Sequence, residues 1–414
     1  MQKDTTKVPF TGYQKIVVLI LALTQFTVIL DFMVMSPLGD LLMKSMNLHP
    51  AQFGVAVSAY AFSAGASGLL TAGFADRFDR KKLLTFFYSG FILGTIFCGL
   101  AHTYPLLVMA RIFTGLFGGV IASISMAIVT DLFDIHHRGR VMGFLMMGFG
   151  ASQVLGVPIS LFFANRWGWW MPFLLVAGFA MLVMILIQVK LKPVNKHLQM
   201  QKDRSPFAHL LKTFINKEYR MGYTCTALVS IGGFLMMPFG SAFAVNNLGL
   251  TNEQLPLLFM VSGITALIIL PFVGKLADRI DKARLFAMGS LWMITIALIY
   301  TRLSITPLWV VVAWNVLLMI GILGRSIPAN ALVSAVPQME DRGAFMSINS
   351  SLQQIAGGVA AMVAGLIVVQ KDKYSPLEHY DMVGYLMTGL TMISVWMIFR
   401  VSEMIKARMQ MQKA

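Results

Sequence analysis

The sequence predicts an all-α membrane protein with twelve transmembrane helices in two pseudo-symmetric halves of six helices each. Its 414 residues are 57% hydrophobic and 12% charged, which is more apolar surface than a water-soluble core of this length can bury. Apolar stretches long enough to cross a bilayer recur along the whole chain. A charged pattern after the second stretch returns 202 residues later, which indicates an internal repeat.

A spanning helix needs about 20 mostly apolar residues, and twelve segments of the chain meet that requirement. They are residues 16–43, 52–75, 83–103, 105–130, 139–164, 170–190, 221–246, 255–277, 284–302, 307–336, 343–369 and 380–400. The first is too long for the core of a signal peptide and lacks a small-residue cleavage pattern after it. Prolines inside several segments are compatible with helices, because neighbouring helices satisfy the freed backbone groups in a membrane. Cys98 and Cys225 fall in apolar segments without metal or redox spacing, so we expect them to be packing residues.

The distribution of basic residues orients the chain in the membrane. If the N-terminus is cytoplasmic, most of the 33 lysines and arginines fall on the inner side. The outer side then carries Lys44, Arg166, Arg302, Lys371 and Lys373. This asymmetry is typical of cytoplasmic loops and places both termini in the cytoplasm. The net charge of +15 therefore reflects membrane topology, and we do not expect nucleic acid as a partner. We expect a multi-pass protein of a cell membrane, such as a bacterial inner membrane.

The longest polar interruption lies between the sixth and seventh segments. It divides the chain into an N-terminal six-helix bundle at 1–189, a cytoplasmic linker at 190–220 and a C-terminal six-helix bundle at 221–414. Within the linker, Ser205 and Pro206 form a helix-start signal that precedes apolar residues at helical spacing. This pattern favours an amphipathic helix in the inner interface over a linker with a catalytic function.

The loop after the second segment is unusually rich in charge, and the second half of the chain repeats it. Asp278, Arg279, Asp281, Lys282 and Arg284 follow Asp76, Arg77, Asp79, Arg80 and Lys82 at a constant spacing of 202 residues. "HRGRVMG" at 137–143 and "DRGAFMS" at 341–347 form a weaker repeat, as do "QVLG" at 153–156 and "QIAG" at 354–357. Two repeats of the same orientation are typical of transporters that bind substrate between their halves, near the middle of the membrane.

These features resemble the Major Facilitator Superfamily over essentially the whole chain. The family's loop motif, Gly-x-x-x-Asp-Arg-x-Gly-Arg-Arg/Lys, is matched by Ala72, Asp76, Arg77, Asp79, Arg80 and Lys81, with both glycines replaced, whereas the second copy retains the first one as Gly274. The antiporter pattern of the fourth span is matched by Arg111, Gly115, Gly118 and Gly119, and that of the fifth span in part by Gly148, Gly156 and Pro158. The stretch "LDFMVMSPLG" resembles the drug and sugar efflux branch, which includes arabinose-efflux-like permeases.

The repeated acidic residues of the charged loops indicate a conformational latch. Asp76 can sit against the positive N-terminal end of the eleventh span near Arg342, and Asp278 can make the mirrored contact near Arg138. Arg77, Arg80 and Arg279 complete this candidate set. A plain solvated loop would explain the basic residues but not the repeated acidic ones.

Ionisable groups inside the spans are few, so each is a candidate functional residue. Asp31 lies within the first span, where a carboxylate costs roughly 2.5–3.5 kcal/mol on insertion scales. Burial favours its protonated form, whereas an approaching arginine favours the ionised form. A contact with Arg111 in one conformation only would therefore couple proton binding to conformation. The alternatives are a permanent ion pair between the two spans, or an Arg111 side chain that extends to the outer surface.

Arg325 has no acidic partner within the spans of its own half. It can bind an anionic or hydroxyl-rich substrate, or it can extend to the inner face. Polar residues that could line the same cavity are Gln153, Asn330, Asn349, Ser350, Gln353 and Gln354. Each of these is also compatible with an ordinary contact between helices.

The expected function is secondary active transport, in which a small organic molecule is exported in exchange for protons by alternating access. A symporter that imports a nutrient is the first alternative, since Asp31 would serve either direction. A transport-inactive scaffold or receptor is the second. We expect no enzyme activity, cofactor or metal, because the sequence contains no phosphate-binding Gly-Lys-Ser/Thr loop, metal-ligand spacing or nucleophile motif.

Overall fold

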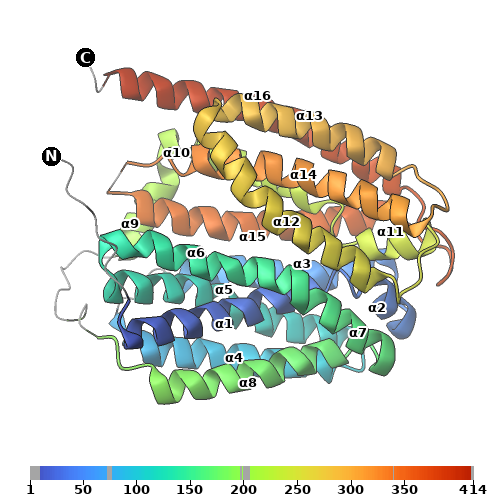
Figure 1. Cartoon of the computed structure of the whole chain (residues 1–414), viewed down its shortest axis with the longest axis horizontal. Helices are drawn as coiled ribbons and strands as arrows, with labels where there is room; N and C mark the ends of the chain where they lie inside the picture. The colour runs from blue at the N-terminus through green and yellow to red at the C-terminus, as the bar shows by residue number, and fades with distance from the viewer. Residues whose placement is uncertain (1–9, 72–76, 196–197, 199–205, 339, 412–414) are drawn as a thin grey trace.

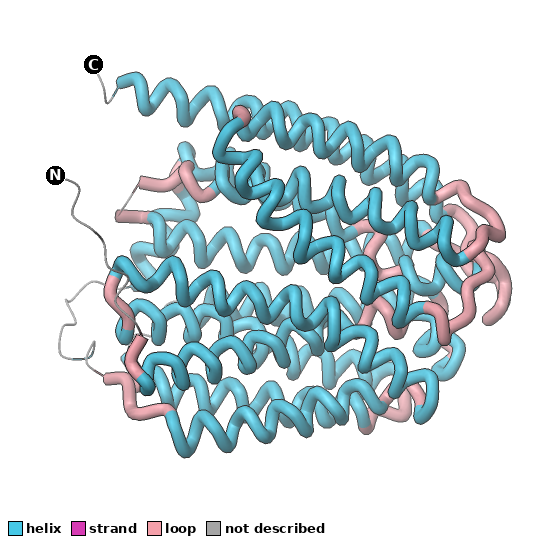
Figure 2. Tube along the Cα trace, in the orientation of Figure 1, coloured by secondary structure: helices cyan, strands magenta, loops and turns pink. Residues whose placement is uncertain are grey.

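The computed structural model describes residues 10–71, 77–195, 198, 206–338 and 340–411. Within these ranges the chain forms long helices joined by short loops, and no strand is present apart from an isolated bridge between Val369 and Glu378 (Figure 2). Eleven of the described helices are long and apolar enough to cross a membrane. The predicted all-α membrane fold is confirmed.

The described residues of the first half of the chain form eight α-helices and one π-helical segment. Their bounds are α1 Gly12–Val34, α2 Gly39–Met46, α3 Pro50–Thr71, α4 Arg80–Gly99, α5 Tyr104–Leu132, α6 Ile135–Ala151, α7 Val157–Trp167 and α8 Met171–Lys190. The π-helical segment Ser152–Gly156 joins α6 to α7. In Figure 1 these helices, from blue to green, form the lower part of the molecule.

The second half repeats this arrangement in the upper part of Figure 1. Its helices are α10 Lys217–Phe234, α11 Gly240–Asn246, α12 Leu255–Arg279, α13 Lys282–Tyr300, α14 Leu308–Val333, α15 Arg342–Ile367 and α16 Tyr380–Met411. The expected linker helix is α9, Pro206–Ile215, and Leu211 and Phe214 on it are exposed, as an interfacial helix requires. Ser205, its expected cap, lies outside the described residues. We call the end of the molecule where α1 starts and α16 ends the terminal end, and the opposite end the distal end.

The first and seventh expected spans are each broken in two, which the sequence analysis did not anticipate. α1 ends at Val34 and α2 begins at Gly39, while α10 ends at Phe234 and α11 begins at Gly240. Both breaks contain the same pattern, Met35-Ser36-Pro37-Leu38-Gly39 and Met236-Met237-Pro238-Phe239-Gly240. Proline removes an N–H donor and disfavours helical geometry in the residue before it, so it ends each helix here. The two breaks occupy matching places in the two halves.

The halves meet along closely packed helix pairs. α3 runs antiparallel to α15, and a Cβ added to Gly54 would lie 2.7 Å from the carbonyl oxygen of Ala361. Nearer the middle of the helices, a Cβ on Gly358 would lie 3.2 Å from the Cβ of Ala61. α12 approaches the π-helical segment in the same way, with Gly263 against Gln153. Small residues let the backbones approach each other, which is the usual means of helix association in membranes.

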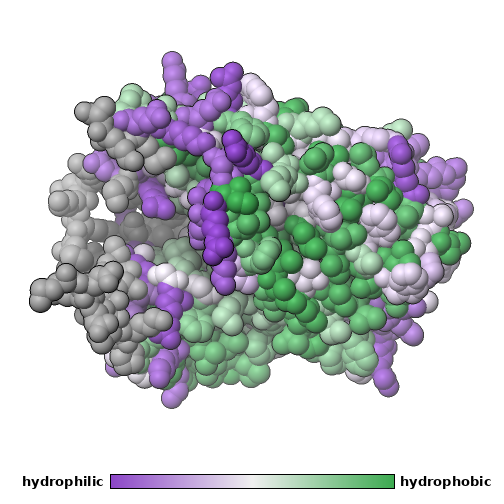
Figure 3. All heavy atoms as spheres, turned by 45° about the horizontal axis from the view of Figure 1, so that its top comes forward, coloured by the Kyte–Doolittle hydropathy of each residue, from purple (hydrophilic) through white to green (hydrophobic). Residues whose placement is uncertain are grey.

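The surface has the distribution of polarity that a lipid environment requires. Figure 3 shows hydrophobic residues over the middle of the visible face and hydrophilic residues at both of its ends. Large apolar side chains in this belt are exposed, for example Phe272 on α12 and Leu291 on α13. Such a band exceeds what monomeric water-soluble proteins expose, and it matches the hydrocarbon layer of a bilayer.

Candidate functional site

The candidate site is centred on an ion pair between α1 and α5. Arg111 Nη1 donates to Asp31 Oδ2 at 2.9 Å, and both side chains are completely buried. The structure thus joins the two residues that the sequence singled out as a pair. Arg111 does not extend to the surface, although it lies only seven residues after the first residue of α5 at the distal end. Burial of both charges in hydrocarbon strengthens their attraction and makes the loss of either partner costly.

Two uncharged residues complete the surroundings of the ion pair. Thr95 on α4 donates its hydroxyl to Asp31 Oδ1 at 3.2 Å. Tyr60 on α3 covers the guanidinium group, with Arg111 Cζ 4.5 Å from the ring centroid, which is a cation–π distance. Arg111 Nε and Nη2 are buried without a hydrogen-bond partner. The guanidinium group therefore has spare donors, and its bond to Asp31 is not locked by a bidentate geometry.

Buried polar contacts continue along α1 from Asp31 toward the terminal end. The hydroxyl groups of Thr27 and Tyr88 lie 2.8 Å apart. Two residues earlier on α1, Gln25 Nε2 donates to Ser125 Oγ on α5 at 3.1 Å. Polar side chains in a membrane helix bundle are satisfied by such contacts between helices. Thr27 lies one turn before Asp31 on the same face of α1, whereas Gln25 lies on another face, and we call Asp31, Thr27 and Tyr88 the polar column.

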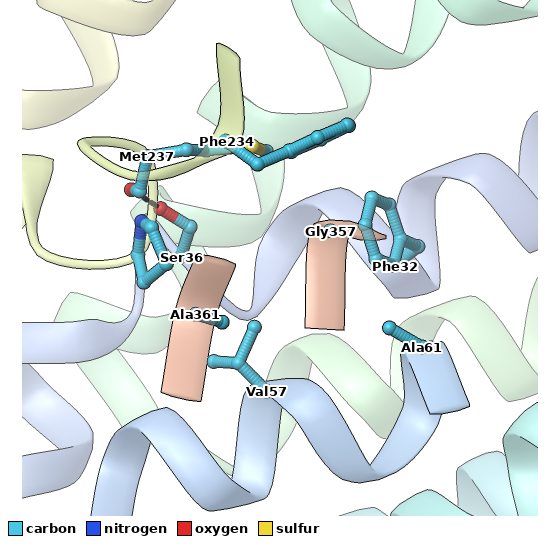
Figure 4. Close-up of a pocket in the computed structure, with 9 residues that line it drawn as sticks. Phe32, Ser36, Val57, Ala61, Phe234, Met237, Gly357 and Ala361 are labelled. Carbon is cyan, nitrogen blue, oxygen red and sulfur yellow. Dashed lines mark hydrogen bonds between the residues drawn. The ribbon is translucent and has the colours of Figure 1, made fainter. Parts of the chain in front are cut away.

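A small pocket between the halves adjoins the ion pair. It is lined by Phe32, Ser36, Val57, Ala61, Phe234, Met237, Pro238, Gly357 and Ala361 (Figure 4). Phe32 follows Asp31 on α1, and its ring lies 5.6 Å from the ring of Tyr60. A continuous series of contacts therefore joins the pocket to Arg111 through Phe32 and Tyr60. The lining is mostly apolar, with Ser36 and backbone groups as its polar members.

The two helix breaks close the distal end of the molecule against each other. Ser36 Oγ donates to the carbonyl group of Met237, as Figure 4 shows, and Ser241 Oγ donates to the carbonyl group of Ser36 at 2.7 Å. Phe53 on α3 packs edge-on against Phe239, with ring centroids 5.6 Å apart. The break between α1 and α2 is thus held against the break between α10 and α11 and the start of α11.

Asp40 on α2 strengthens this closure with its carboxylate. Its side chain is 1% exposed and accepts from Asn246 Nδ2 on α11 at 2.7 Å and from Asn252 Nδ2 at 3.1 Å. Lys44, one turn later on α2, lies 2.8 Å from Oδ1. Hydrogen bonds to a charged acceptor are about twice as strong as those between neutral groups. The sequence analysis did not identify Asp40, because it lies near the end of its span, where an acid at an i,i+4 spacing from a lysine is common on surfaces.

Arg325 on α14 is enclosed in the second half and reaches neither surface, with 1% exposure. Its Nη1 donates to Thr391 Oγ1 on α16 at 3.1 Å and lies 3.6 Å from Met293 Sδ. Its Cζ is 5.5 Å from the ring centroid of Phe286. Nε and Nη2 have no hydrogen-bond partner. This cation therefore contrasts with Arg111, which has a carboxylate.

The other predicted polar residues are dispersed. Gln153 lies in the π-helical segment with Oε1 buried and unpaired, and Asn349 accepts from Thr226 at 2.5 Å within the second half. Asn330, Ser350 and Gln353 are exposed, and Gln354 is partly buried. The structure does not gather these side chains around Arg325. These residues could contact one substrate only if the two halves adopted a different arrangement.

The predicted latch residues are found mostly at the terminal end. Arg80 Nε donates to Asp131 Oδ2 at 3.1 Å, while Arg77, Asp278, Arg279 and Arg342 are exposed. Asp76 lies outside the described residues. Arg138 donates to the carbonyl groups of Phe133 and Thr130 in its own half. Asp79 and Asp281, at the position of the motif's second glycine, cap the next helices by accepting from backbone N–H groups.

Sequence reasoning missed Thr95, Tyr60 and the distal closure. Thr95 and Tyr60 are uncharged and stand in apolar helices, so their types do not distinguish them from packing residues. The sequence signals them only indirectly, because a buried guanidinium group needs more neighbours than one carboxylate to offset its desolvation. Among the described residues no group of three metal-ligating side chains is present.

Comparisons with known proteins agree with this architecture. A family model described as Major Facilitator Superfamily matches residues 21–361 and 222–407. Two similar proteins of Bacillus subtilis (strain 168) are the Uncharacterized MFS-type transporter YbcL and Multidrug resistance protein 2. The first is 23% identical over 394 residues, and the second 22% over 386; each alignment covers 92% of this chain and 95% of the relative.

Solved structures show the same fold at low sequence identity. The crystal structure of D-xylose-proton symporter has a TM-score of 0.77 at 18% identity and covers 94% of this chain and 97% of its own. A bacterial homolog of the human lysosomal transporter Spinster, in an inward-facing and occupied conformation, has a TM-score of 0.76 at 15% identity, with coverage of 95% and 98%. At these identities the likeness concerns the fold.

Proposed function

The chain belongs to the Major Facilitator Superfamily, and we propose that it is a proton-coupled antiporter that exports a small organic molecule by alternating access. The observation that carries this proposal is the completely buried Asp31–Arg111 pair beside a pocket between the halves. A buried ion pair is a poor source of stability compared with apolar packing, so its presence in a membrane core favours a functional explanation.

The coupling follows from competition for Asp31. In the observed arrangement Arg111 and Thr95 both donate to the carboxylate, which favours its ionised form. When the guanidinium group moves away, the buried carboxylate takes a proton instead. A substrate that occupies the pocket packs against Phe32 and, through Tyr60, holds the aromatic cover over Arg111 in its pair with Asp31. Proton binding and substrate binding therefore favour different positions of Arg111, as exchange requires.

The polar column gives protons a route between Asp31 and the terminal end. Thr27 and Tyr88 carry hydroxyl groups that can both donate and accept; Thr27 lies on α1 with Asp31, and Tyr88 lies on α4, the helix of Thr95. With the basic terminal end in the cytoplasm, the distal closure made by Ser36, Ser241 and Asp40 is the outer gate. The observed arrangement is then the state whose outer gate is closed.

The direction of transport is proposed as export. The relative named Multidrug resistance protein 2, similar over almost the whole chain, supports this direction. The fourth-span pattern that begins at Arg111 also resembles antiporters. Import by proton symport remains the alternative, because the same ion pair can release or bind its proton in either order.

The test is transport in everted membrane vesicles with an imposed pH gradient, across a panel of neutral, cationic and anionic compounds. We expect uptake of at least one compound into the vesicles to require a gradient that is acid inside. Asp31→Asn should abolish the gradient-driven uptake. Glu403→Gln, which changes an exposed acid on α16, is the matched control and should behave as the parent protein does.

A second measurement keeps coupling separate from folding. Addition of the transported compound to the purified protein in detergent should release protons into a weakly buffered solution, and Asp31→Asn should bind the compound without release. Transport that ignores the gradient would contradict proton antiport. Uptake driven by a gradient that is acid outside would favour the symporter, and binding of no compound would favour a scaffold.

A further inference from the structure

The second half contains a buried arginine without a carboxylate, at a place where the first half has both. The internal repeat makes the comparison specific. Asp31 stands four residues before Met35 of the first helix break, and Gly232 stands four residues before Met236 of the second. Gly232 is thus the counterpart of Asp31. Where the first half carries its acid, the second carries no side chain.

The space left by Gly232 faces Arg325. A Cβ added to Gly232 would lie 3.6 Å from both Nη1 and Nη2 of Arg325, and 3.4 Å from Thr391 Oγ1. All three distances are ordinary van der Waals contacts, so the backbone of α10 leaves room for a Cβ atom beside the guanidinium group. Asp31 on α1 thus faces Arg111 on α5, and Gly232 on α10 faces Arg325 on α14. In each half the arginine comes from the fourth predicted span.

Several donors near this space lack acceptors. Arg325 Nε and Nη2 are buried and unpaired, and so is Ser290 Oγ on α13. Ser290 lies one turn from both Phe286 and Met293, the two α13 residues that contact Arg325, so the three share one face of the helix. An arginine cannot lose its proton to relieve such burial. Unpaired buried donors around a fixed positive charge call for an anion.

None of the acidic side chains that the structure describes in the second half supplies this anion. Asp281 pairs with Lys406, Glu378 with Lys371 and Glu218 with Arg408, all near helix ends or in loops. Asp341 is engaged with Tyr219 and His209 at the start of α15. Cys225 on α10 lies close enough to Arg325 to interact with it electrostatically, but a buried thiol stays neutral.

We propose that Arg325, Thr391 and the space over Gly232 form a binding site for a monovalent anionic group, which takes the place that Asp31 has in the first half. The anionic group is either the carboxylate of a small transported acid or a free halide ion. Hydroxyl and guanidinium donors suit both, because each binds through charge-assisted hydrogen bonds. In its carboxylate form the inference rests on the proposed transport function and names its substrate class. In its halide form it is independent of that function.

The test uses the purified full-length protein in detergent and follows thermal unfolding by tryptophan fluorescence. The sodium salt of the buffer MES, which supplies neither a carboxylate nor a halide, is replaced stepwise by sodium chloride or sodium acetate at constant ionic strength. We expect the unfolding midpoint to rise and to saturate with chloride, acetate or both, because a ligand that binds only the folded state stabilises it. Arg325→Gln should remove the response. A midpoint that does not depend on the anion would overturn the proposal.

A glycine pair supplies the control that does not depend on removing a buried arginine. Gly232→Asp places a carboxylate beside Arg325 and should raise the unfolding midpoint in the MES reference while abolishing the anion response. Gly233→Asp puts the same side chain one residue further on α10, where a Cβ meets nothing within 4 Å, and should retain the anion response. If Gly232→Asp also keeps the response, the anion is bound elsewhere and the proposal fails.

Counterflow of radiolabelled acetate and benzoate in proteoliposomes separates the two sources of the anion. Exchange that Gly232→Asp and Arg325→Gln both abolish identifies the carboxylate of a substrate. Saturable stabilisation by chloride without exchange of acids identifies a bound halide. If pH-gradient-driven transport of a neutral compound persists in a protein with no anion response, the proposed function stands and this inference alone is overturned.

Discussion

The ring of Tyr60 on α3 lies over the guanidinium group of Arg111 on α5, with Cζ 4.5 Å from the ring centroid. The same ring lies 5.6 Å from the ring of Phe32, which lines the pocket. Tyr60 is therefore the residue through which a change in the pocket reaches the ion pair. It contributes a π face and not a charge, so its substitution tests the contact without altering the balance of charge.

Tyr60→Leu should lower the thermal stability of the protein more than Tyr60→Phe does. Phenylalanine keeps an aromatic face over Arg111, whereas leucine loses a desolvated cation–π contact of roughly 1–2 kcal/mol. We expect Tyr60→Phe to unfold within about one degree of the parent protein and Tyr60→Leu to unfold clearly lower. Equal midpoints for the two variants would show that the ring serves only to fill space.

The ion pair should show strong coupling in a double-mutant cycle. Asp31→Asn leaves a buried arginine that cannot become neutral, so it should cost about 3–5 kcal/mol. Arg111→Gln should cost less, because Asp31 can take up a proton, and its cost should shrink as the pH is lowered. The double variant should recover most of the loss. Thermal unfolding of the four proteins at two pH values measures the cycle, and additive losses would contradict the pairing.

Asp40 should control the opening of the distal end. Asp40→Asn removes the negative charge that contacts Lys44, Asn246 and Asn252. We expect the closed state to lose about 1.5 kcal/mol, which raises the open fraction roughly tenfold. Ser241→Cys reports opening, since Ser241 is buried in the closure. Its labelling by a membrane-impermeant thiol reagent should accelerate in Asp40→Asn.

Labelling of Ser241→Cys is read in a background in which Cys98 and Cys225 are alanine. Asp372→Asn, at an exposed acid in the distal loop before α16, is the control and should leave the labelling rate unchanged. Identical rates in Asp40→Asn and in the control would mean that the carboxylate does not hold the gate.

The close approach of α3 and α15 should not tolerate a side chain at Gly54. Its Cβ would lie 2.7 Å from the Ala361 carbonyl oxygen and 3.1 Å from the Cα of Gly365, both of them backbone atoms. Gly54→Leu should therefore lower the unfolding midpoint and increase Ser241→Cys labelling. Gly178→Leu on α8, where a Cβ meets nothing within 4 Å, should do neither. Similar effects of the two changes would argue against this seam.

The pair between Asp281 and Lys406 should make stability depend on pH in the acid range. The ammonium group of Lys406, 2.6 Å away, holds the pKa of the Asp281 carboxyl below its usual range. Its stabilising effect is therefore complete above the unfolded pKa of about 4 and is lost as the pH falls through the lower folded value.

Lys406→Met removes that effect, and the difference in unfolding midpoint from the parent protein should shrink between pH 6 and pH 3. The difference corresponds to at most about 1 kcal/mol, because Lys406 is largely exposed. A difference that grows toward low pH would contradict the sign of the coupling.

The sequence predicts the helical membrane fold well, because a span of hydrocarbon demands a run of apolar residues whatever the neighbours are. It also predicts that Asp31 and Arg111 pair, since two opposite charges in the same half have few other means of offsetting their desolvation. Arg325 could not be placed in this way. Without a carboxylate inside the spans of its half to predict its partner, its surroundings depend on packing that cannot be read from the sequence.

The helix breaks were not predictable for a different reason. Hydropathy stays high through Ser36 and Pro37, and proline is tolerated in membrane helices, so neither feature marks an interruption. Only the fold brings Ser36 beside Met237 and Ser241, 201 and 205 positions later in the chain. Tyr60 and Thr95 likewise gain their importance from what they touch and not from their type.

The contact between α3 and α15, which we call the seam, presents few steric barriers to a rotation of one helix against the other. At Gly54 and Gly365 backbone faces backbone, so no side chain there has to change rotamer before one helix rolls on the other. Under the proposed alternating access, α3 and α15 would stay in contact while the two bundles rotate relative to each other. The rate of the cycle would then be set at the ends of the molecule, where hydrogen bonds must break, and a faster protein would be sought by altering those ends.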